Sequence, residues 1–307
     1  MKALLFPGQG SQIVGMGKEF FNNFNIVKNI FEQADQKLKF KISKIILEGP
    51  ENDLKLTKNT QPAILTVSYA IYKLLAEEFE FNTDKINFFA GHSLGEYSAL
   101  VCAESLSFED ALYLLHERGK AMQEAVPIGE GAMLAVLGVD IKEVNKYISK
   151  IENKKICEIA NDNANGQLIV SGDLESINKL QEILKYNKKK SILLPVSAPF
   201  HCSLMKSAAV NMSEKIMGIK FSIPKKDIVT NVTAEVEKSP EKIKKLLIEQ
   251  IYSKVRWRES ILYMQKKNIN EFIEIGPGKV LSGLVKRIVK DSNTKSINSL
   301  EDIKNIK

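Results

Sequence analysis

Short apolar runs alternate with longer amphipathic segments along most of this chain of 307 residues. The runs at 3–6, 86–89, 228–231 and 271–275 are short enough for buried strands. Between them, apolar residues recur at a spacing of three or four, which predicts helices with one buried face. The expected helices cover 27–38, 42–47, 63–79, 108–125, 203–217, 243–251, 257–263 and 280–289. Strands that alternate with helices predict an α/β domain with a mostly parallel sheet.

Two local signals predict where elements begin and end. Pro62 is placed to open the helix at 63–79, because a proline at the first helical position loses no hydrogen bond. The residues after 289 are mostly polar, and we expect them to be frayed.

The pattern changes between residues 127 and 195. The expected order is strand 132–137, helix 141–151, strand 156–160, turn 161–166, strand 167–171, helix 174–186 and strand 191–194. This βαββαβ order matches a split βαβ, ferredoxin-like unit. We therefore expect a small ferredoxin-like domain at 127–195, inserted into a large α/β-hydrolase-like catalytic domain formed by 1–126 and 196–307.

A possible catalytic serine lies between the expected strand at 86–89 and a further expected helix that starts at 96–100. Residues 91–95 read Gly-His-Ser-Leu-Gly, the G-x-S-x-G pattern of a nucleophile elbow. In such a turn the hydroxyl group of Ser93 projects away from the sheet. The N-terminus of the following helix offers free backbone N–H groups to an oxyanion. The alternative is a glycine-flanked turn whose serine caps the helix.

Other possible site residues are less distinctive. His201 follows a proline-rigid turn and precedes a helix, so it is held firmly enough to act as a base. Arg118 lies within the helix at 108–125; its planar guanidinium can hold a carboxylate through two parallel bonds, or form a surface salt bridge. His116, on the same helix, is expected to be structural. The glycine-rich turn at 7–12 lacks the third glycine of a dinucleotide loop and the Gly-Lys-Ser/Thr of a phosphate loop.

Charge and cysteine content narrow the functional classes. The chain carries 44 Lys+Arg against 37 Asp+Glu, a net charge of +7, which suits an acidic or phosphorylated partner. No basic run interleaved with aromatic residues indicates nucleic-acid binding. The three cysteines are far apart, and no histidine pairs with another His or Cys at ligand spacing, so we expect neither disulfides nor a metal site. With no signal peptide or membrane span expected, the sequence favours a cytoplasmic enzyme.

Several motifs occur together in one order. They are Phe-Pro-Gly-Gln-Gly-Ser-Gln at 6–12, Thr-Gln-Pro at 60–62, Gly-His-Ser-Leu-Gly-Glu-Tyr at 91–97, Arg-Gly at 118–119, residues 161–167, Phe-His-Cys at 200–202 and Glu-Ile-Gly-Pro-Gly at 274–278. Over essentially its full length, the chain resembles the malonyl-CoA:acyl-carrier-protein transacylases of dissociated fatty acid synthesis. It is similar also to the acyltransferase domains of polyketide synthases.

The resemblance implies a role for each matching residue. Ser93 is the nucleophile that accepts the acyl group as an ester, and His201 is the general base. The main-chain carbonyl of Gln250 orients the imidazole, so the side chain at this position is expected to matter little. The remaining implied residues are the oxyanion-hole donors Gln9 and Leu94, and the substrate-binding residues Arg118, Gln61, His92 and Phe200.

The resemblance also implies substrates and partners. Arg118 would pair with the free carboxylate of malonate. Phe200 before His201 favours malonyl over methylmalonyl, but methylmalonyl stays open as an alternative acyl group. Malonyl-CoA enters as the donor substrate, with no cofactor or metal, and the acceptor is an acidic holo acyl carrier protein. We expect a monomer. The alternatives are a serine esterase or thioesterase with the same serine and base, and a carrier-binding module with a decayed site.

Overall fold

The computed structural model describes residues 1–79, 81–196 and 198–304. A six-stranded sheet forms its larger part, in the order β10-β9-β1-β2-β7-β8, with every pair parallel except β7 and β8. Its strands are β1 (Lys2–Phe6), β2 (Ile86–Gly91), β7 (Asp227–Val229), β8 (Val236–Glu237), β9 (Glu271–Ile275) and β10 (Asn293–Ile297). The prediction of an α/β fold with a mostly parallel sheet is therefore confirmed.

Helices cover both faces of this sheet, because its inner strands are apolar on both sides. Leu4 and Phe6 of β1 join one hydrophobic cluster, whereas Ala3 and Leu5 join another cluster on the opposite face. The larger cluster lies against α2 (Asn25–Leu38), α3 (Ile42–Glu48), α5 (Thr57–Glu78), α6 (Gly95–Cys102), α7 (Phe108–Glu124), α10 (Lys206–Gly218) and α11 (Pro240–Gln250). The smaller cluster lies against α12 (Trp257–Lys266) and α13 (Val280–Ile288). We refer to this sheet and its helices as the six-stranded unit.

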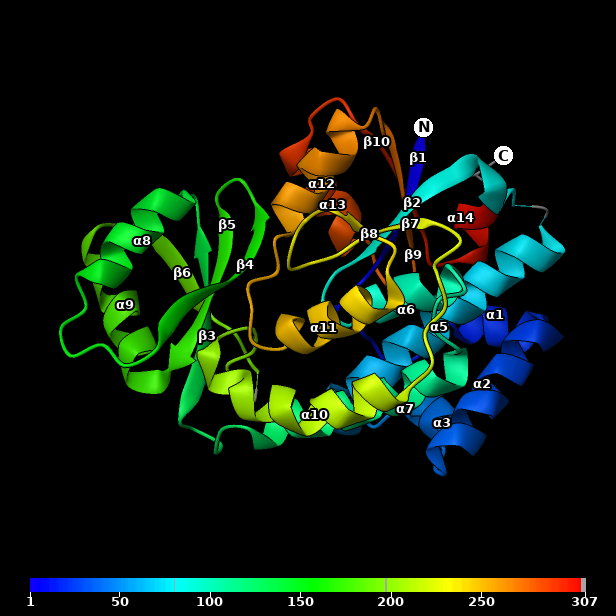
Figure 1. Cartoon of the computed structure of the whole chain (residues 1–307), viewed down its shortest axis with the longest axis horizontal. Helices are drawn as coiled ribbons and strands as arrows, with labels where there is room; N and C mark the ends of the chain where they lie inside the picture. Colours follow the sequence, from blue (N-terminus) through cyan, green and yellow to red (C-terminus); the bar gives the residue numbers. More distant parts are fainter. Residues whose placement is uncertain (80, 197, 305–307) are drawn as a thin grey trace.

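A separate antiparallel sheet has the order β4-β5-β3-β6. It consists of β3 (Gly131–Leu137), β4 (Cys157–Ala164), β5 (Gln167–Asp173) and β6 (Lys190–Leu193). Its helices α8 (Ile141–Ser149) and α9 (Leu174–Tyr186) lie on the outer side of the sheet, at the left of Figure 1, and share a third hydrophobic cluster with it. We refer to this part as the four-stranded unit.

Side-chain caps begin several of these helices where the sequence places a short polar residue. Ser107 accepts a hydrogen bond from Asp110 N at 3.0 Å and so caps α7. Asp140 caps α8 and Asp173 caps α9 in the same way. Helix α7, which carries Arg118, thus has a fixed starting point.

The prediction that Pro62 opens a helix is wrong. Helix α5 begins at Thr57 and contains Pro62, which cannot donate to the carbonyl of Lys58, four residues earlier. His116 of α7 lies 2.9 Å from that carbonyl and donates through Nδ1. A histidine side chain therefore satisfies the acceptor that proline leaves free, which accounts for the structural role expected of His116.

Other parts of the secondary structure also differ from the prediction. The expected turn at 161–166 is mostly strand, since β4 continues to Ala164 with register shifts that let its polar residues pair. The expected frayed C-terminus instead forms β10 and α14 (Leu300–Lys304), while residues 305–307 lie outside the described part. β10 is an edge strand rich in polar residues, so it lacks a strong apolar signal. The short elements α1 (Lys18–Asn23), α4 (Glu51–Lys55) and β8 also went unpredicted.

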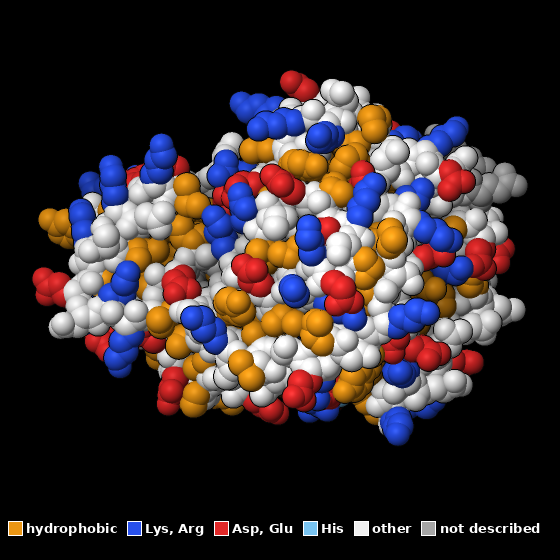
Figure 2. Space-filling view, viewed as in Figure 1, with side chains coloured by type: hydrophobic (Ala, Val, Ile, Leu, Met, Phe, Trp, Pro, Cys, Tyr) orange, Lys and Arg blue, Asp and Glu red, His pale blue; other side chains and the backbone are white. Residues whose placement is uncertain are grey.

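The surface shows no single charged patch on the side that Figure 2 displays. Lysine and arginine side chains are scattered over both units, with acidic side chains among them. None of the helices in the described residues has both the length and the apolar character needed to span a bilayer.

Candidate active site

Ser93 lies in a strained turn at the carboxyl end of β2, directly before α6. Its backbone has a φ of 52°, in the left-handed region that side-chain-bearing residues rarely adopt. The two flanking glycines allow this turn: a Cβ on Gly91 would collide with the Gly95 carbonyl, and one on Gly95 would collide with the Phe6 carbonyl. The glycine requirement of the G-x-S-x-G pattern thus comes from backbone packing between β1, β2 and α6.

Asn231 and Glu96 hold this turn in place, and the sequence analysis assigned neither. Asn231 Oδ1 accepts from Ser93 N at 2.7 Å, and its Nδ2 donates to the Gly91 carbonyl at 2.7 Å. Glu96 Oε2 in turn accepts from Asn231 N at 2.9 Å. Asn231 is the last residue of the predicted strand at 228–231, and polar residues at the carboxyl ends of parallel strands commonly form sites. That position was the available signal.

His201 lies within hydrogen-bonding distance of the serine. Its Nε2 is 2.8 Å from Ser93 Oγ, and its Nδ1 is 2.8 Å from the Gln250 carbonyl. Since a carbonyl only accepts, Nδ1 carries the proton and Nε2 is left to accept from the serine. Burial, assisted by the charge of Arg118, lowers the pKa of His201 to about 3. The imidazole is therefore neutral at physiological pH, as a general base must be.

Arg118 is buried beside these two residues, with 1% of its surface exposed. Its Nη2 donates to Ser93 Oγ at 3.2 Å and to Gln250 Oε1 at 2.8 Å, and its Nη1 donates to Gln61 Oε1 at 2.8 Å. Within the described residues these three acceptors are all neutral oxygens, and the Nε of Arg118 has no partner. A buried cation without a bound anion is costly. The site is therefore suited to an anionic ligand.

The Gln250 side chain has more contacts than the sequence analysis expects. Besides accepting from Arg118, its Nε2 donates to Glu96 Oε2 at 2.8 Å and to the Ser93 carbonyl at 3.1 Å. The residue is fully buried. These contacts count against the expectation that this side chain matters little, because its removal would leave several buried polar groups unpaired.

The other predicted site residues lie around this centre. Phe200 is buried directly before His201, which also has a left-handed φ, of 58°. His92 Nε2 lies 2.9 Å from Asn163 Oδ1, and burial lowers the pKa of His92. Gln61 accepts from Arg118 through Oε1, and its own Nε2 donates to Met122 Sδ at 3.8 Å.

The two predicted oxyanion-hole residues lie on neighbouring loops. Gln9 follows β1 and Leu94 precedes the first residue of α6, and the ends of β1 and β2 are paired through Phe6 and Gly91. The N–H of Leu94 comes before the first intrahelical bond of α6, so the helix leaves it without an acceptor. Their role as oxyanion donors stays a prediction.

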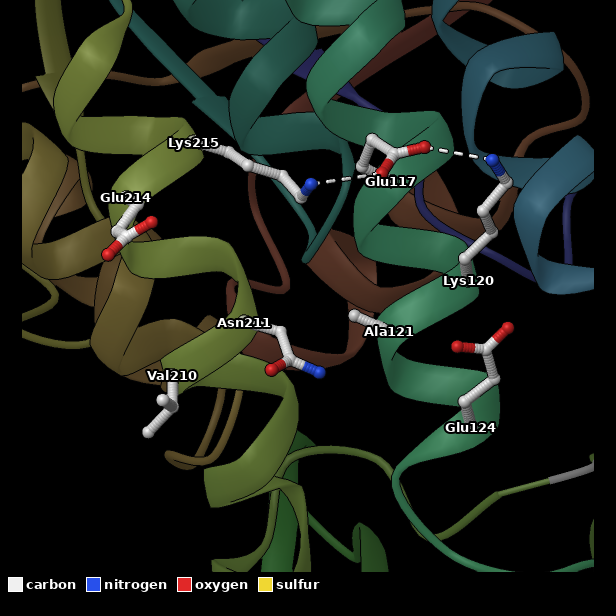
Figure 3. Close-up of a pocket in the computed structure, with 8 residues that line it drawn as sticks. All are labelled: Glu117, Lys120, Ala121, Glu124, Val210, Asn211, Glu214 and Lys215. Atoms are coloured by element: carbon white, nitrogen blue, oxygen red, sulfur yellow. Dashed lines mark hydrogen bonds and ion pairs between the residues drawn. The ribbon is translucent and has the colours of Figure 1, made fainter.

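A pocket of about 460 Å³ lies elsewhere, between α7 and α10. Figure 3 shows its charged lining, including Glu117 paired with Lys120 and Lys215; none of the residues described above lines it. Within the described ranges, no group of three or more His, Cys, Asp or Glu residues could hold a metal ion.

Known proteins of similar sequence identify the family of this chain. A family model described as an acyl transferase domain matches residues 3–305. The chain belongs to the acyl transferase family. This acyl transferase is 44% identical over 303 residues to the malonyl CoA-acyl carrier protein transacylase of Bacillus subtilis, covering 98% of this chain and 94% of the relative. With the protein of the same name from Staphylococcus aureus it shares 43% identity over 98% of this chain and 97% of the relative.

Solved structures give the same result for the fold. This acyl transferase superposes on an acyl-carrier-protein S-malonyltransferase from Bartonella henselae with a TM-score of 0.96 and 42% identity, covering 99% of this chain and 97% of the other. It also matches a malonyl-transacylase in complex with its type II PKS acyl-carrier protein, with a TM-score of 0.95 and 37% identity over 99% and 98% of the two chains.

Proposed function

We propose that this acyl transferase moves a malonyl group from coenzyme A to the phosphopantetheine thiol of acyl carrier protein, through an ester on Ser93. The observation that carries the proposal is one buried cluster. Ser93 Oγ lies 2.8 Å from His201 Nε2 and 3.2 Å from Arg118 Nη2. A nucleophile, a neutral base and a carboxylate-binding group therefore meet at one atom.

The first half-reaction forms the ester. His201 Nε2 takes the Ser93 proton as Oγ attacks the thioester carbonyl, and the backbone N–H groups of Gln9 and Leu94 hold the resulting oxyanion. Each such donor is typically worth about 3 kcal/mol. The tetrahedral intermediate then expels the coenzyme A sulfur, which receives the proton from His201.

The second half-reaction reverses these steps with a different thiol. The carrier-protein thiol gives its proton to His201 and attacks the Ser93 ester, and the serine oxygen leaves with that proton. Both half-reactions need the same neutral imidazole, which the Gln250 carbonyl orients at 2.8 Å. The mechanism is therefore ping-pong and needs no cofactor or metal.

Arg118 selects the acyl group. Its guanidinium is buried and donates only to neutral oxygens, so a malonyl carboxylate would supply the direct ion pair that Arg118 lacks in the fold. An acetyl group leaves the guanidinium without that partner, which disfavours it. His92 and Phe200, next to the two catalytic residues in the chain, complete the acyl site.

The finer description of the fold belongs to the same proposal. We describe residues 127–195 as a ferredoxin-like domain inserted into an α/β-hydrolase-like domain of residues 1–126 and 196–307. The antiparallel order β4-β5-β3-β6, with a helix after β3 and another after β5, supports the ferredoxin-like description. The strand–Ser93–helix elbow supports the hydrolase-like one.

The setting of the enzyme is proposed as well. The three cysteines are free and buried, which fits a reducing cytoplasm. A monomer holds all the residues of the proposed site. The net charge of +7 fits an acidic carrier protein, through electrostatic steering that weakens with salt.

A transfer assay separates this proposal from an esterase or thioesterase with the same dyad. Enzyme, malonyl-CoA and holo acyl carrier protein are mixed, and malonyl carrier protein and free malonate are followed by mass spectrometry. We expect malonyl carrier protein as the main product and no turnover by Ser93→Ala. Free malonate as the main product would favour the esterase.

A further inference from the structure

The side-chain amide of Gln250 lies between two groups of fixed hydrogen-bonding polarity. Arg118 can only donate, and it donates to Gln250 Oε1 at 2.8 Å. Glu96 Oε2 accepts on the other side, from Gln250 Nε2 at 2.8 Å and from Asn231 N at 2.9 Å. The three side chains form a relay from carboxylate to amide to guanidinium.

This relay works in one orientation of the amide only. If the Gln250 amide turned over, its NH₂ would face the Arg118 donor and its oxygen would face the Glu96 acceptor. Both contacts would then be lost inside a buried site, where an unpaired polar group is costly. Glu96 Oε1 has no partner in the described residues, so a proton on Glu96 would sit there and leave Oε2 free to accept. The relay thus has the same polarity in either protonation state of Glu96.

We propose that Glu96 is a positioning residue for recognition of the acyl carboxylate, acting through the Gln250 side chain on Arg118. The proposal rests on the function proposed above. Glu96 fixes the amide, and the amide oxygen together with Gln61 Oε1 fixes the guanidinium plane beside Ser93 Oγ. The residue does not touch the acyl group, and its effect is on selectivity.

Two variants of Glu96 test this role. Glu96→Met keeps the bulk and removes both acceptors, so that the Gln250 amide can turn over. Glu96→Gln keeps one oxygen that can accept and should recover part of the loss. The measured quantity is the ratio of the second-order rate constants for Ser93 ester formation from malonyl-CoA and from acetyl-CoA. We expect Glu96→Met to lower this ratio about tenfold, the value of one hydrogen bond to a charged group.

The matched control is Glu117→Gln, one residue before Arg118 on the same helix. Glu117 faces the pocket of Figure 3 and pairs with Lys120 at 2.9 Å and Lys215 at 3.2 Å. This variant removes the same charge outside the relay, and we expect a wild-type ratio from it.

A folded Glu96→Met enzyme with the wild-type ratio would overturn the proposal, as would equal losses with both thioesters, the mark of a merely structural role. If Glu96→Met does not fold, Gln250→Met breaks the same relay without removing a charge, and an unchanged ratio there would overturn it too. A wild-type enzyme that forms no malonyl ester would instead refute the proposed function.

Discussion

At the scale of single residues, the proposed function depends on the different effects of burial on two basic side chains. Arg118 remains a cation whose acceptors in the fold are neutral oxygens, whereas His201 is kept neutral. Arg118 can therefore bind a carboxylate, while His201 can take a proton from the serine. The motifs predicted the identity of both residues, but not their environment.

Removing the guanidinium should change selectivity more than reactivity. In Arg118→Ala the nucleophile and base remain, so acetyl-CoA should still form an ester on Ser93. We expect the preference for malonyl over acetyl to fall at least about thirtyfold, because a buried charged partner is lost. The measurement is the rate of ester formation with each thioester. An unchanged preference would exclude Arg118 as the carboxylate-binding group.

Burial of His201 also predicts how stability depends on pH. The pKa of an unfolded histidine is near 6.5, and that of His201 in the fold is about 3. As pH falls from 7.5 to 5, the unfolded chain takes up a proton that the folded chain does not, so the wild type is destabilised. The variant His201→Ala lacks this pH-dependent contribution to the free energy of unfolding. The wild type should lose about 2 kcal/mol of unfolding free energy relative to the variant over this range.

Urea unfolding of both proteins at several pH values measures this difference. Glu96 and the other titrating groups are present in both, so they cancel in the comparison. Parallel curves would mean that His201 titrates normally in the fold.

The residues that sequence reasoning missed are those whose role depends on the fold. Asn231 reads as the last residue of a strand, and Glu96 as an ordinary first-turn carboxylate. Asn231 belongs to none of the motifs, and the motif that contains Glu96 does not indicate which groups its carboxylate contacts. Their hydrogen bonds to the Ser93 turn join segments 135 residues apart, as between Asn231 N and Glu96 Oε2. A single sequence does not reveal such a pairing.

At the scale of elements, strong apolar periodicity made most helices and inner strands predictable. The failures have physical reasons. Helix α5 starts before Pro62 because His116 replaces the lost hydrogen bond at Lys58, a contact between distant segments. Strand β10 is polar because it lies at the edge of the sheet.

The contact between α6 and β1 gives a prediction about the elbow. A Cβ on Gly95 would lie 2.8 Å from the Pro7 carbonyl and closer still to the Phe6 carbonyl, and backbone atoms cannot move aside easily. We expect Gly95→Ala to lower the free energy of unfolding by about 3 kcal/mol. Equilibrium unfolding in urea measures the change.

Gly283→Ala serves as the matched control for Gly95→Ala. Gly283 lies inside helix α13 with nothing within 4 Å of an added Cβ, and alanine there should raise stability by about 0.5 to 1 kcal/mol. If both variants had wild-type stability, backbone packing would not be the reason for glycine at 95.

At the scale of the whole molecule, the site depends on contacts between the two units. His201 lies on the segment by which the chain returns from β6 to the six-stranded unit. Asp162 of β4 is held by Arg258 of α12 at 2.7 Å, and Gln167 of β5 accepts from Arg287 of α13 at 2.6 Å. These contacts hold β4 of the four-stranded unit in place, so that its Asn163 lies beside His92 of the six-stranded unit. Sequence patterns predicted both units but none of the contacts that join them.

The central claim is that one serine carries the malonyl group between two thiols. It is tested most directly by the intact mass of the protein after brief mixing with malonyl-CoA, followed by addition of holo acyl carrier protein. The account predicts a malonyl adduct on the wild type, none on Ser93→Ala, and rapid discharge of the adduct by the carrier protein. An adduct on Ser93→Ala, or one that decays in water as fast without the carrier protein as with it, would contradict the account.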